Sequence, residues 1–454
     1  MVTVIAMALS GCATWSPASP AASASAPAST HTPATSVNPL VRWWQTFNDP
    51  LLSSLVTQAL QANTSVRSAQ AALQQSRALR DVKGASLLPG INASGSAGRS
   101  KSGDADASNS FKAGLDASWE PDIFGGKRSA LNATEADAQA SEASLADVQV
   151  SVAAEVALAY IQLRGLQAQL AIARSNLASQ QETLQITDWR AQAGLITSLE
   201  VAQARTATEQ TSAQIPSLDV SIAKTQHSLA VLTGQRPDAL LVMLNATQAV
   251  PQAAGDLAHS IPAQTLRQRP DVRAAEHRIT AALARVSAAE AARYPGFSIQ
   301  GSLGLSGLTL GALSNGASLA SSLLAGISIP LFDGGAARSQ VLAQEAALEQ
   351  ARASYQAVVL TALKDVDDAL VALQGDRTRQ QHLQSAADAA NQAALLAQNR
   401  YSSGLIDFQT VLQTQRSLLT AQDSVASTAA DLSADHVRLY KALGGGWTPT
   451  SPQE

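Results

Sequence analysis

Four stretches of the chain alternate apolar and polar residues with a period of two, which is typical of β-strands that expose one face. In the clearest stretch, Phe111, Leu115 and Trp119 lie on one face and Lys112 and Asp116 on the other. The pattern predicts strands at about residues 90–99, 111–120, 296–307 and 319–331. Each run has about ten residues, the length of a tilted membrane strand. A water-soluble sandwich would show the same alternation.

Very long helices are predicted after each pair of strands. No proline occurs from Asp122 to Ile215 or from Leu331 to Thr448. Residues 127–189 can therefore form one helix of roughly 60 residues, on the order of 90 Å long. A helix of that length in water normally needs a coiled-coil partner. Rows repeating every seven residues supply the seams: Leu163, Leu170, Leu177 and Leu184; Val201, Ile215, Ile222 and Leu229, with Thr208 interrupting; and Val411, Leu418, Val425, Leu432 and Leu439.

Gly194 and Gly404 are predicted to mark the tips of two helical hairpins, at about residues 190–200 and 400–410. Glycine permits the positive φ angle that a tight break between antiparallel helices requires.

The chain also repeats itself. The segment from Asn63 to Ala69 resembles the segment from Arg269 to Ala275, 206 positions later, and Gly194-Leu195-Ile196 recurs 210 positions later as Gly404-Leu405-Ile406. A period above 200 residues indicates a duplicated domain rather than a solenoid repeat. The predicted domains are a first repeat at 37–250, a second at 251–443 and a tail at 444–454.

Four membrane strands cannot close a barrel, because the smallest closed barrels have eight. An open edge in lipid would leave backbone groups unpaired at several kcal/mol each, so several chains must pool their strands. Twelve strands from three chains would leave a channel, and the inward rows are polar, which predicts a wet lumen. These rows contain Lys112, Asp116, Glu120, Ser298, Gln300 and Ser302.

Composition narrows the possibilities further. Hydrophobic residues make up 46% of the chain and the net charge is −4, values that argue against extended disorder. The 31 Lys and Arg residues are balanced by 35 Asp and Glu, so no basic footprint for nucleic acid exists. No run of 18 consecutive apolar residues occurs, which predicts no transmembrane helix, so a crossing would need a closed barrel.

Candidate catalytic and metal-binding chemistry is absent from the sequence. The six histidines are scattered without a His-Glu-x-x-His motif, and one cysteine cannot form a Cys-rich zinc site. Gly444-Gly445-Gly446 lacks the Lys-Ser/Thr of a phosphate-binding loop and reads as a helix end. We therefore expect no enzyme activity, no metal and no cofactor.

The first residues read as an export signal. Residues 1–11 form a short apolar stretch that ends in small residues. Leu9-Ser10-Gly11-Cys12 resembles a bacterial lipobox, in which the cysteine becomes the lipidated N-terminus. Ala13 follows it, which by resemblance to bacterial lipoproteins indicates the outer membrane. Residues 12–36, rich in Ala, Ser, Pro and Thr, are predicted to be a flexible tether.

Several motifs together resemble the TolC-like outer-membrane factors, and most closely the NodT/OprM-like lipoprotein branch associated with RND-type efflux. Trp43-Trp44 with Asp49-Pro50-Leu51 is similar to the opening of the family. The segment from Arg269 to Glu276 is similar to its second-repeat signature. The segments Trp119–Gly125 and Ile329–Gly335 resemble its two strand-to-helix turns.

This resemblance implies a mixed, mainly α fold: a homotrimer with a twelve-stranded outer-membrane barrel, a long helical periplasmic tunnel and a small equatorial region. It also implies a passive duct for drugs or other small molecules, which docks with a periplasmic adaptor and an RND-type inner-membrane pump. The residues implied to dock are Arg190, Gly194, Leu195, Arg400, Gly404 and Leu405.

A gate at the closed tunnel end is implied as well. Glu200 and Tyr401 match positions where the family often has a carboxylate and the tyrosine that bonds it. The acidic pair of well-known members is missing, because the matching segment runs from Thr410 to Gln413; Asp407 lies nearby at another helical angle. Ile406 replaces an arginine seen in some family latches.

Two other functions are open on the sequence. A trimeric surface adhesin or structural coiled-coil lipoprotein could carry the same barrel, but it needs only one barrel segment per chain, which the duplication does not favour. An enzyme of envelope metabolism predicts a clustered constellation that the sequence lacks.

Overall fold

The computed structural model of the chain describes residues 40–447, apart from 105, 255–267 and 315–318. The predicted signal peptide at 1–11, the tether at 12–36 with Cys12, and the tail beyond residue 447 lie outside the described residues.

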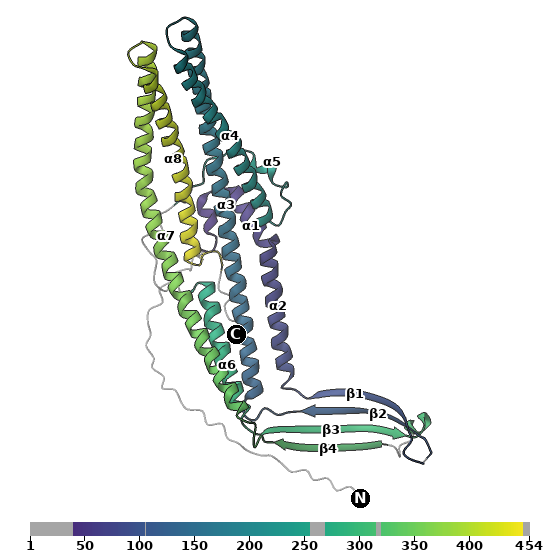
Figure 1. The fold of residues 1–454 in the computed structure, drawn as a ribbon. Helices are drawn as coiled ribbons and strands as arrows, with labels where there is room; N and C mark the ends of the chain where they lie inside the picture. The colour runs from purple at the N-terminus through teal and green to yellow at the C-terminus, as the bar shows by residue number, and fades with distance from the viewer. Residues whose placement is uncertain (1–39, 105, 255–267, 315–318, 448–454) are drawn as a thin grey trace, which may run out of the picture. The chain divides into compact units, whose positions relative to one another are not determined.

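Each half of the chain contains the same five elements in the same order (Figure 1). In the first half these are α2 (Thr64–Ala85), β1 (Gly90–Ser100), β2 (Ser108–Trp119), α3 (Gly126–Gln192) and α4 (Ser198–Leu232). In the second half they are α6 (Pro270–Ala291), β3 (Gly296–Gly307), β4 (Leu319–Ser328), α7 (Ala336–Ser402) and α8 (Phe408–Ala442). Corresponding helices have equal lengths of 22, 67 and 35 residues.

Short elements complete the described chain: the 3-10 helix η1 (Trp43–Phe47), α1 (Pro50–Ala62), α5 (Leu241–Leu244) and the 3-10 helix η4 (Leu310–Ser314). Seven residues separate β1 from β2, and eleven separate β3 from β4. The difference of four residues accounts for the change of offset from 206 before the strands to 210 after them.

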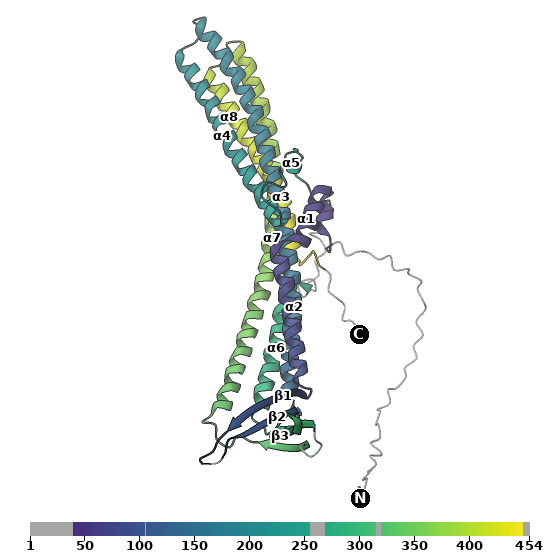
Figure 2. The ribbon, with the colours of Figure 1, turned by 90° about the vertical axis from the view of Figure 1, so that its right-hand side faces the viewer.

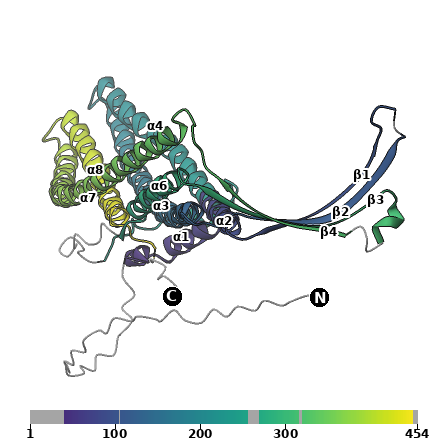
Figure 3. The same cartoon turned by 90° about the horizontal axis from the view of Figure 1, so that it is seen from below.

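The four strands form one antiparallel sheet in the order β1-β2-β3-β4. The central pair, β2 and β3, joins the two repeats, with Trp119 opposite Ile299. Figure 3 shows that the sheet is curved. The last strand ends at Ser328, opposite Gly296, rather than at 331 as the alternation predicts. The ladder stops there because Pro295 and Pro330 have no N–H to donate.

The helices pack as two antiparallel hairpins, α3 with α4 and α7 with α8, and α3 also packs against α2, α6 and α8. Figure 2 shows both hairpins extending away from the sheet. The largest buried cluster lies where η1 and α1 cover the middle of α3 and meet the end of α8. Trp43, with no exposed surface, stacks on Tyr440 at a ring-centroid distance of 5.3 Å and packs edge-on against Trp44 and Phe47.

Helix α3 has the length and composition of a membrane span over one 18-residue window, and half of that window is buried within the molecule. The seven-residue rows of the sequence predict a helix that packs against neighbouring helices here. Core helices that pack on several neighbours have the same composition, so this window is weak evidence for a membrane helix.

The two repeats close on themselves in the same way. The Asn63 side chain, before α2, donates to the backbone oxygen of Leu232 at the end of α4 (2.8 Å). Arg269, before α6, donates to the backbone oxygen of Ala442 at the end of α8 (2.8 Å). Gly234 follows the first contact with φ 72°, and a Cβ there would lie 2.4 Å from the backbone oxygen of Ala62. The duplication therefore extends to individual contacts.

Candidate functional site

The sheet has one apolar and one polar face. Directly opposed residues of antiparallel strands share a face, so the register assembles the apolar one from Ile91, Ala93, Ala97, Phe111, Ala113, Leu115, Ala117, Trp119, Phe297, Ile299, Leu303, Leu305, Leu319, Leu323, Ala325 and Ile327. Leu323 is 82% exposed and Ile91 71% exposed. In a single chain this face is uncovered, so it requires an apolar environment.

The opposite face carries Asn92, Ser94, Ser96, Ser110, Lys112, Asp116, Ser118, Ser298, Gln300, Ser302, Ser306, Ser322 and Ser328. Polar side chains bridge neighbouring strands on it: Ser94 donates to the Asp116 carboxylate (3.1 Å), and the Ser302 and Ser322 hydroxyls lie 2.8 Å apart. Leu324, opposite Gln300, is a large apolar exception on the polar face, and Ser321, opposite Leu303, is a polar exception on the apolar one. This face is suited to water.

Exposed aromatic side chains gather where the strands meet the helices. Phe124 and Tyr294 stack at 4.9 Å, and Phe297 lies 6.3 Å from Phe124. Phe124 is 45% and Tyr294 56% exposed. Aromatic girdles of this kind flank the apolar band of membrane barrels.

The two hairpin tips have matching geometry. Gly194 (φ 73°) and Gly404 (φ 74°) take the left-handed conformation that follows a helix end. The amide of Leu195 donates to the backbone oxygen of Arg190, and that of Leu405 to the backbone oxygen of Arg400, both at 2.9 Å. Leu195 and Leu405 are 68% and 73% exposed, and Arg400 is exposed. Each tip therefore presents an apolar side chain to solvent.

Two of the residues expected in the gate cap helices in this chain. The Glu200 carboxylate accepts from the backbone amide of Thr197 (3.0 Å) at the start of α4. Asp407 accepts from the amide and the hydroxyl of Thr410 (2.8 and 2.6 Å) at the start of α8, and these bonds lower its pKa. Gln413 is exposed on α8. The Thr-x-x-Glu spacing from Thr197 to Glu200 is a capping signal that the sequence already carried.

The hydrogen bond expected between Glu200 and Tyr401 is not formed in this chain. Tyr401 is 8% exposed, and its hydroxyl oxygen is buried without a hydrogen-bond partner in the described structure. Burial raises the pKa of Tyr401; the positive charge of Arg190 opposes this shift, and the negative charge of Glu200 adds to it. Arg190 contacts Tyr401 instead: its Nη1 donates to the Tyr401 backbone oxygen (3.2 Å), and its guanidinium carbon lies 4.6 Å from the ring centroid.

A small apolar cluster connects the two hairpins near their tips. Its buried members are Ala204, Ala207, Ala397, Tyr401, Phe408, Val411 and Leu412, from α4, α7 and α8. Tyr401 and Phe408 lie 5.4 Å apart, ring centroid to ring centroid.

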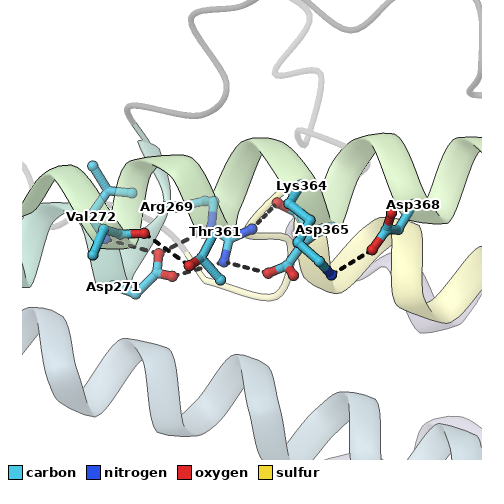
Figure 4. Close-up of polar contacts among 9 residues, drawn as sticks. Arg269, Asp271, Val272, Thr361, Lys364, Asp365 and Asp368 are labelled. Atoms are coloured by element: carbon cyan, nitrogen blue, oxygen red, sulfur yellow. Dashed lines mark hydrogen bonds and ion pairs between the residues drawn. The ribbon is translucent and has the colours of Figure 1, made fainter.

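The second-repeat signature forms an ionic junction between α6, α7 and α8 (Figure 4). Arg269 pairs with Asp271 at 2.7 Å and with Asp365 at 3.3 Å. These three residues line a cavity of about 390 Å³, and Asp147 of α3 lines it as well. Burial raises the pKa of Asp147, and the neighbouring charge of Asp271 raises it further. Despite these carboxylates, the described residues contain no group of three His, Cys, Asp or Glu arranged to hold a metal ion.

A buried network around Tyr160 and Arg164 of α3 was not predicted from the sequence. Arg164, with no exposed surface, donates to Gln167 (2.7 Å) and to the backbone oxygen of Ala246 (2.6 Å). Tyr160 donates to Asp49 (2.7 Å) and accepts from Arg164 (3.1 Å). Burial is the main cause that raises the pKa of Tyr160 to about 12. The network holds the N-terminus of α1, at Asp49, and the segment after α5, at Ala246, against the side of α3.

Comparison with known proteins agrees with this geometry. The sequence model described as "Outer membrane efflux protein" matches residues 55–235 and 261–445. The chain is 32% identical over 428 residues to the pyoverdine export outer membrane protein OpmQ of Pseudomonas aeruginosa, covering 89% of this chain and 87% of that protein. It is 32% identical over 436 residues to the toluene efflux pump outer membrane protein TtgF of Pseudomonas putida, covering 94% and 90%.

Solved structures give the same result. The outer-membrane channel OprN superposes with a TM-score of 0.85 at 35% identity, covering 90% of this chain and 93% of that one. The CmeC outer-membrane channel of Campylobacter jejuni superposes with a TM-score of 0.85 at 25% identity, covering 90% and 89%. The mainly helical, TolC-like fold expected from the sequence is therefore confirmed.

Proposed function

Because the chain belongs to the outer membrane efflux protein family and is the outer-membrane channel component of an efflux system, we propose that it works as a homotrimeric duct for small molecules. In this proposal three copies pool their strands into one twelve-stranded barrel, and their hairpins continue as a helical tunnel in the periplasm. The chain supplies the wall of the duct and carries out no catalysis.

The sheet is the observation that carries this proposal. β1 and β4 each have one edge without a strand partner among the described residues. An unpaired edge in lipid costs several kcal/mol per backbone group. Pairing β1 of one copy with β4 of the next removes both edges at once. It also turns the apolar faces toward lipid and the polar faces toward a common water column.

Native mass spectrometry and conductance measurements test the trimeric duct. We expect the detergent-purified full chain to have the mass of three copies and to pass current in planar bilayers once its gate is opened. A monomeric mass, or a trimer that passes no current in any gate variant, would contradict the proposal.

We further propose that the tips dock to a periplasmic adaptor, which in turn engages an RND-type inner-membrane pump. The exposed Leu195 and Leu405 side chains support an apolar contact. Photo-crosslinking at these positions should capture an adaptor in cells, and Arg400→Glu should weaken the capture while trimers persist. Unchanged capture in that variant would argue that the tip arginine takes no part. The relatives named for pyoverdine export and toluene efflux suggest small organic molecules as cargo.

We also propose that Cys12 carries lipid and anchors the protein in the outer membrane. The support is the lipobox-like segment from Leu9 to Cys12. Several acyl chains, at about 0.8 kcal/mol per buried CH₂, would hold the protein firmly. Cys12→Ser should abolish palmitate labelling; persistent labelling would show that another site is modified.

The gate is proposed to lie at the tip end of the tunnel and to be formed by Glu200, Tyr401, Asp407, Thr410 and Gln413. Glu200 and Asp407 stabilise the starts of α4 and α8 in this chain. Replacing Glu200 with Ala tests its part: we expect higher conductance if the start of α4 must be held in place for closure. If Glu200→Ala conducts no more than the parent protein, Glu200 takes no part in the gate.

A further inference from the structure

We infer that Arg190 is the residue that positions Tyr401 and so holds the two hairpins of one chain together near their tips. The inference rests on the proposed gate and names its intrachain link. Arg190 belongs to the last turn of α3 in the first repeat, and Tyr401 to the last turn of α7 in the second. The contact between them therefore crosses from one hairpin to the other.

Two interactions of different kinds fix this contact. The guanidinium group donates to the Tyr401 backbone oxygen at 3.2 Å, and its carbon lies 4.6 Å from the centre of the ring. A cation within about 6 Å of a ring face is attracted by the ring quadrupole, and more strongly when the ring is desolvated. Tyr401 is 8% exposed, so the ring is largely removed from water. The backbone oxygen lies near the C-terminal end of α7, where a cation is also favoured by the helix dipole.

The other groups near Tyr401 are engaged elsewhere or are apolar: the buried Thr187 hydroxyl, which neighbours the Tyr401 side chain, donates to the backbone oxygen of Thr183 (2.6 Å). Glu200 accepts from the amide of Thr197, and Asp407 accepts from Thr410. Ile406 packs against the tip cluster and cannot donate. The Tyr401 hydroxyl has no hydrogen-bond partner in the described structure. The contacts that Arg190 makes are therefore to the ring and to the backbone oxygen of Tyr401.

Only one of the two partners in this contact has an equivalent in the other repeat. The position 210 residues after Arg190 is Arg400, but the position 210 residues before Tyr401 is Ala191, which has no ring. In a closed ring of three chains, hairpins of the first and second repeat alternate. Arg190 can then clamp Tyr401 within each chain, whereas Arg400 would face an alanine across the boundary to the next chain. The three seams within chains are held by this contact and the three seams between chains are not.

Single-channel conductance of the purified full-length trimer, without an adaptor, tests the inference. We expect Arg190→Ala to raise the open probability about tenfold, which corresponds to about 1.4 kcal/mol. Tyr401→Ala should do the same from the other side of the contact. Tyr401→Phe keeps the ring that Tyr401→Ala removes, and both variants keep the backbone oxygen, so Tyr401→Phe should have a lower open probability than Tyr401→Ala.

Arg174→Ala is the matched control. Arg174 lies on the same helix, and its ion pair with Asp219 (3.5 Å) joins α3 to α4 within one hairpin, so its loss should leave the open probability unchanged. If Tyr401→Phe leaks as much as Tyr401→Ala, the hydroxyl forms the latch and the inference is wrong. The inference is also wrong if Arg190→Ala has the same open probability as Arg174→Ala.

A distance measurement covers the case in which a variant conducts poorly. Spin labels on cysteines at Leu195 and Leu405, both exposed, report the separation of the two tips in detergent. Arg190→Ala should broaden this distance distribution, and an unchanged distribution would overturn the inference. Failure of the proposed duct is distinguishable, because then the parent protein itself would be monomeric or silent in every variant.

Discussion

Adding one methyl group at Gly165 tests how closely the two repeats must approach. Gly165 is buried in the middle of α3, and a Cβ built there would lie 2.9 Å from the Cβ of Ala430 on α8. Both atoms are fixed to helical backbone, so the helices themselves must move. At Gly375, 210 residues later in α7, an added Cβ would have no atom of the same chain within 4 Å. The pair separates crowding from backbone effects.

The two substitutions are expected to change the free energy of unfolding in different directions. In a helix interior, replacing Gly by Ala stabilises by about 1 kcal/mol. Gly375→Ala should therefore raise the unfolding temperature. Gly165→Ala has the same gain but adds overpacking of about 1–3 kcal/mol, so it should be neutral or destabilised by up to about 2 kcal/mol. Circular dichroism melts of the detergent-purified trimers measure both variants.

A double-mutant cycle checks the cause. Ala430→Gly alone should destabilise by about 1 kcal/mol, because it places glycine inside α8. Combined with Gly165→Ala it removes the close contact, so the double variant should be more stable than the two separate effects predict. If the effects simply add, or if Gly165→Ala melts above Gly375→Ala, the contact between α3 and α8 is not as close as the structure shows.

Three further predictions concern the junctions between elements. Asn63→Ala should destabilise by about 2 kcal/mol in denaturant titrations, since it removes the cap of α2 and the bond to the Leu232 backbone oxygen; Asn63→Asp keeps the cap and should cost less. Tyr160→Phe should cost about 2 kcal/mol in the same assay because Asp49 loses its donor inside the buried network around Tyr160 and Arg164; an unchanged midpoint would contradict this. Asp147→Asn should raise the melting temperature at pH 7: the folded protein holds the Asp147 pKa above its ordinary value, so the carboxylate opposes folding at neutral pH, and stability is regained as the pH falls through the folded and then the unfolded pKa. The advantage of asparagine should therefore shrink near pH 4, and an advantage that grows in acid would refute the sign.

The sequence was most informative where one period persists over many residues. Alternation between Phe111 and Trp119 located a strand to within a few residues, since a change of one position would reverse every side chain. The absence of proline and the seven-residue rows similarly predicted the long helices, found at Gly126–Gln192 and Ala336–Ser402. The ends of strands and helices are harder to predict because they depend on the segment that pairs with them. The last strand, for example, ends at Ser328 because its pairing with the neighbouring strand stops there.

Contacts between distant segments carried no such signal. From the sequence alone, Arg164 would be expected on the surface of a helix that has few charged residues. Its burial depends on its hydrogen bonds to Gln167 and to the backbone oxygen of Ala246, which is 82 positions away. The clamp of Arg190 on Tyr401 joins residues 211 positions apart. For Glu200 a local signal existed: the Thr-x-x-Glu capping pattern predicts the observed bond better than the family resemblance did.

The equal helix lengths restrict how such a chain can change size. Removing seven residues from each arm of the first hairpin would withdraw its tip by about 10.5 Å at 1.5 Å per residue, while the second tip stayed at its original height. In the proposed trimer, the tips of the first repeat would then stand lower than those of the second, and an adaptor docked on all six tips would lose contact with three of them. Viable deletions must therefore occur as matched sets in all four long helices, whereas the loops of seven and eleven residues at the other end can vary independently.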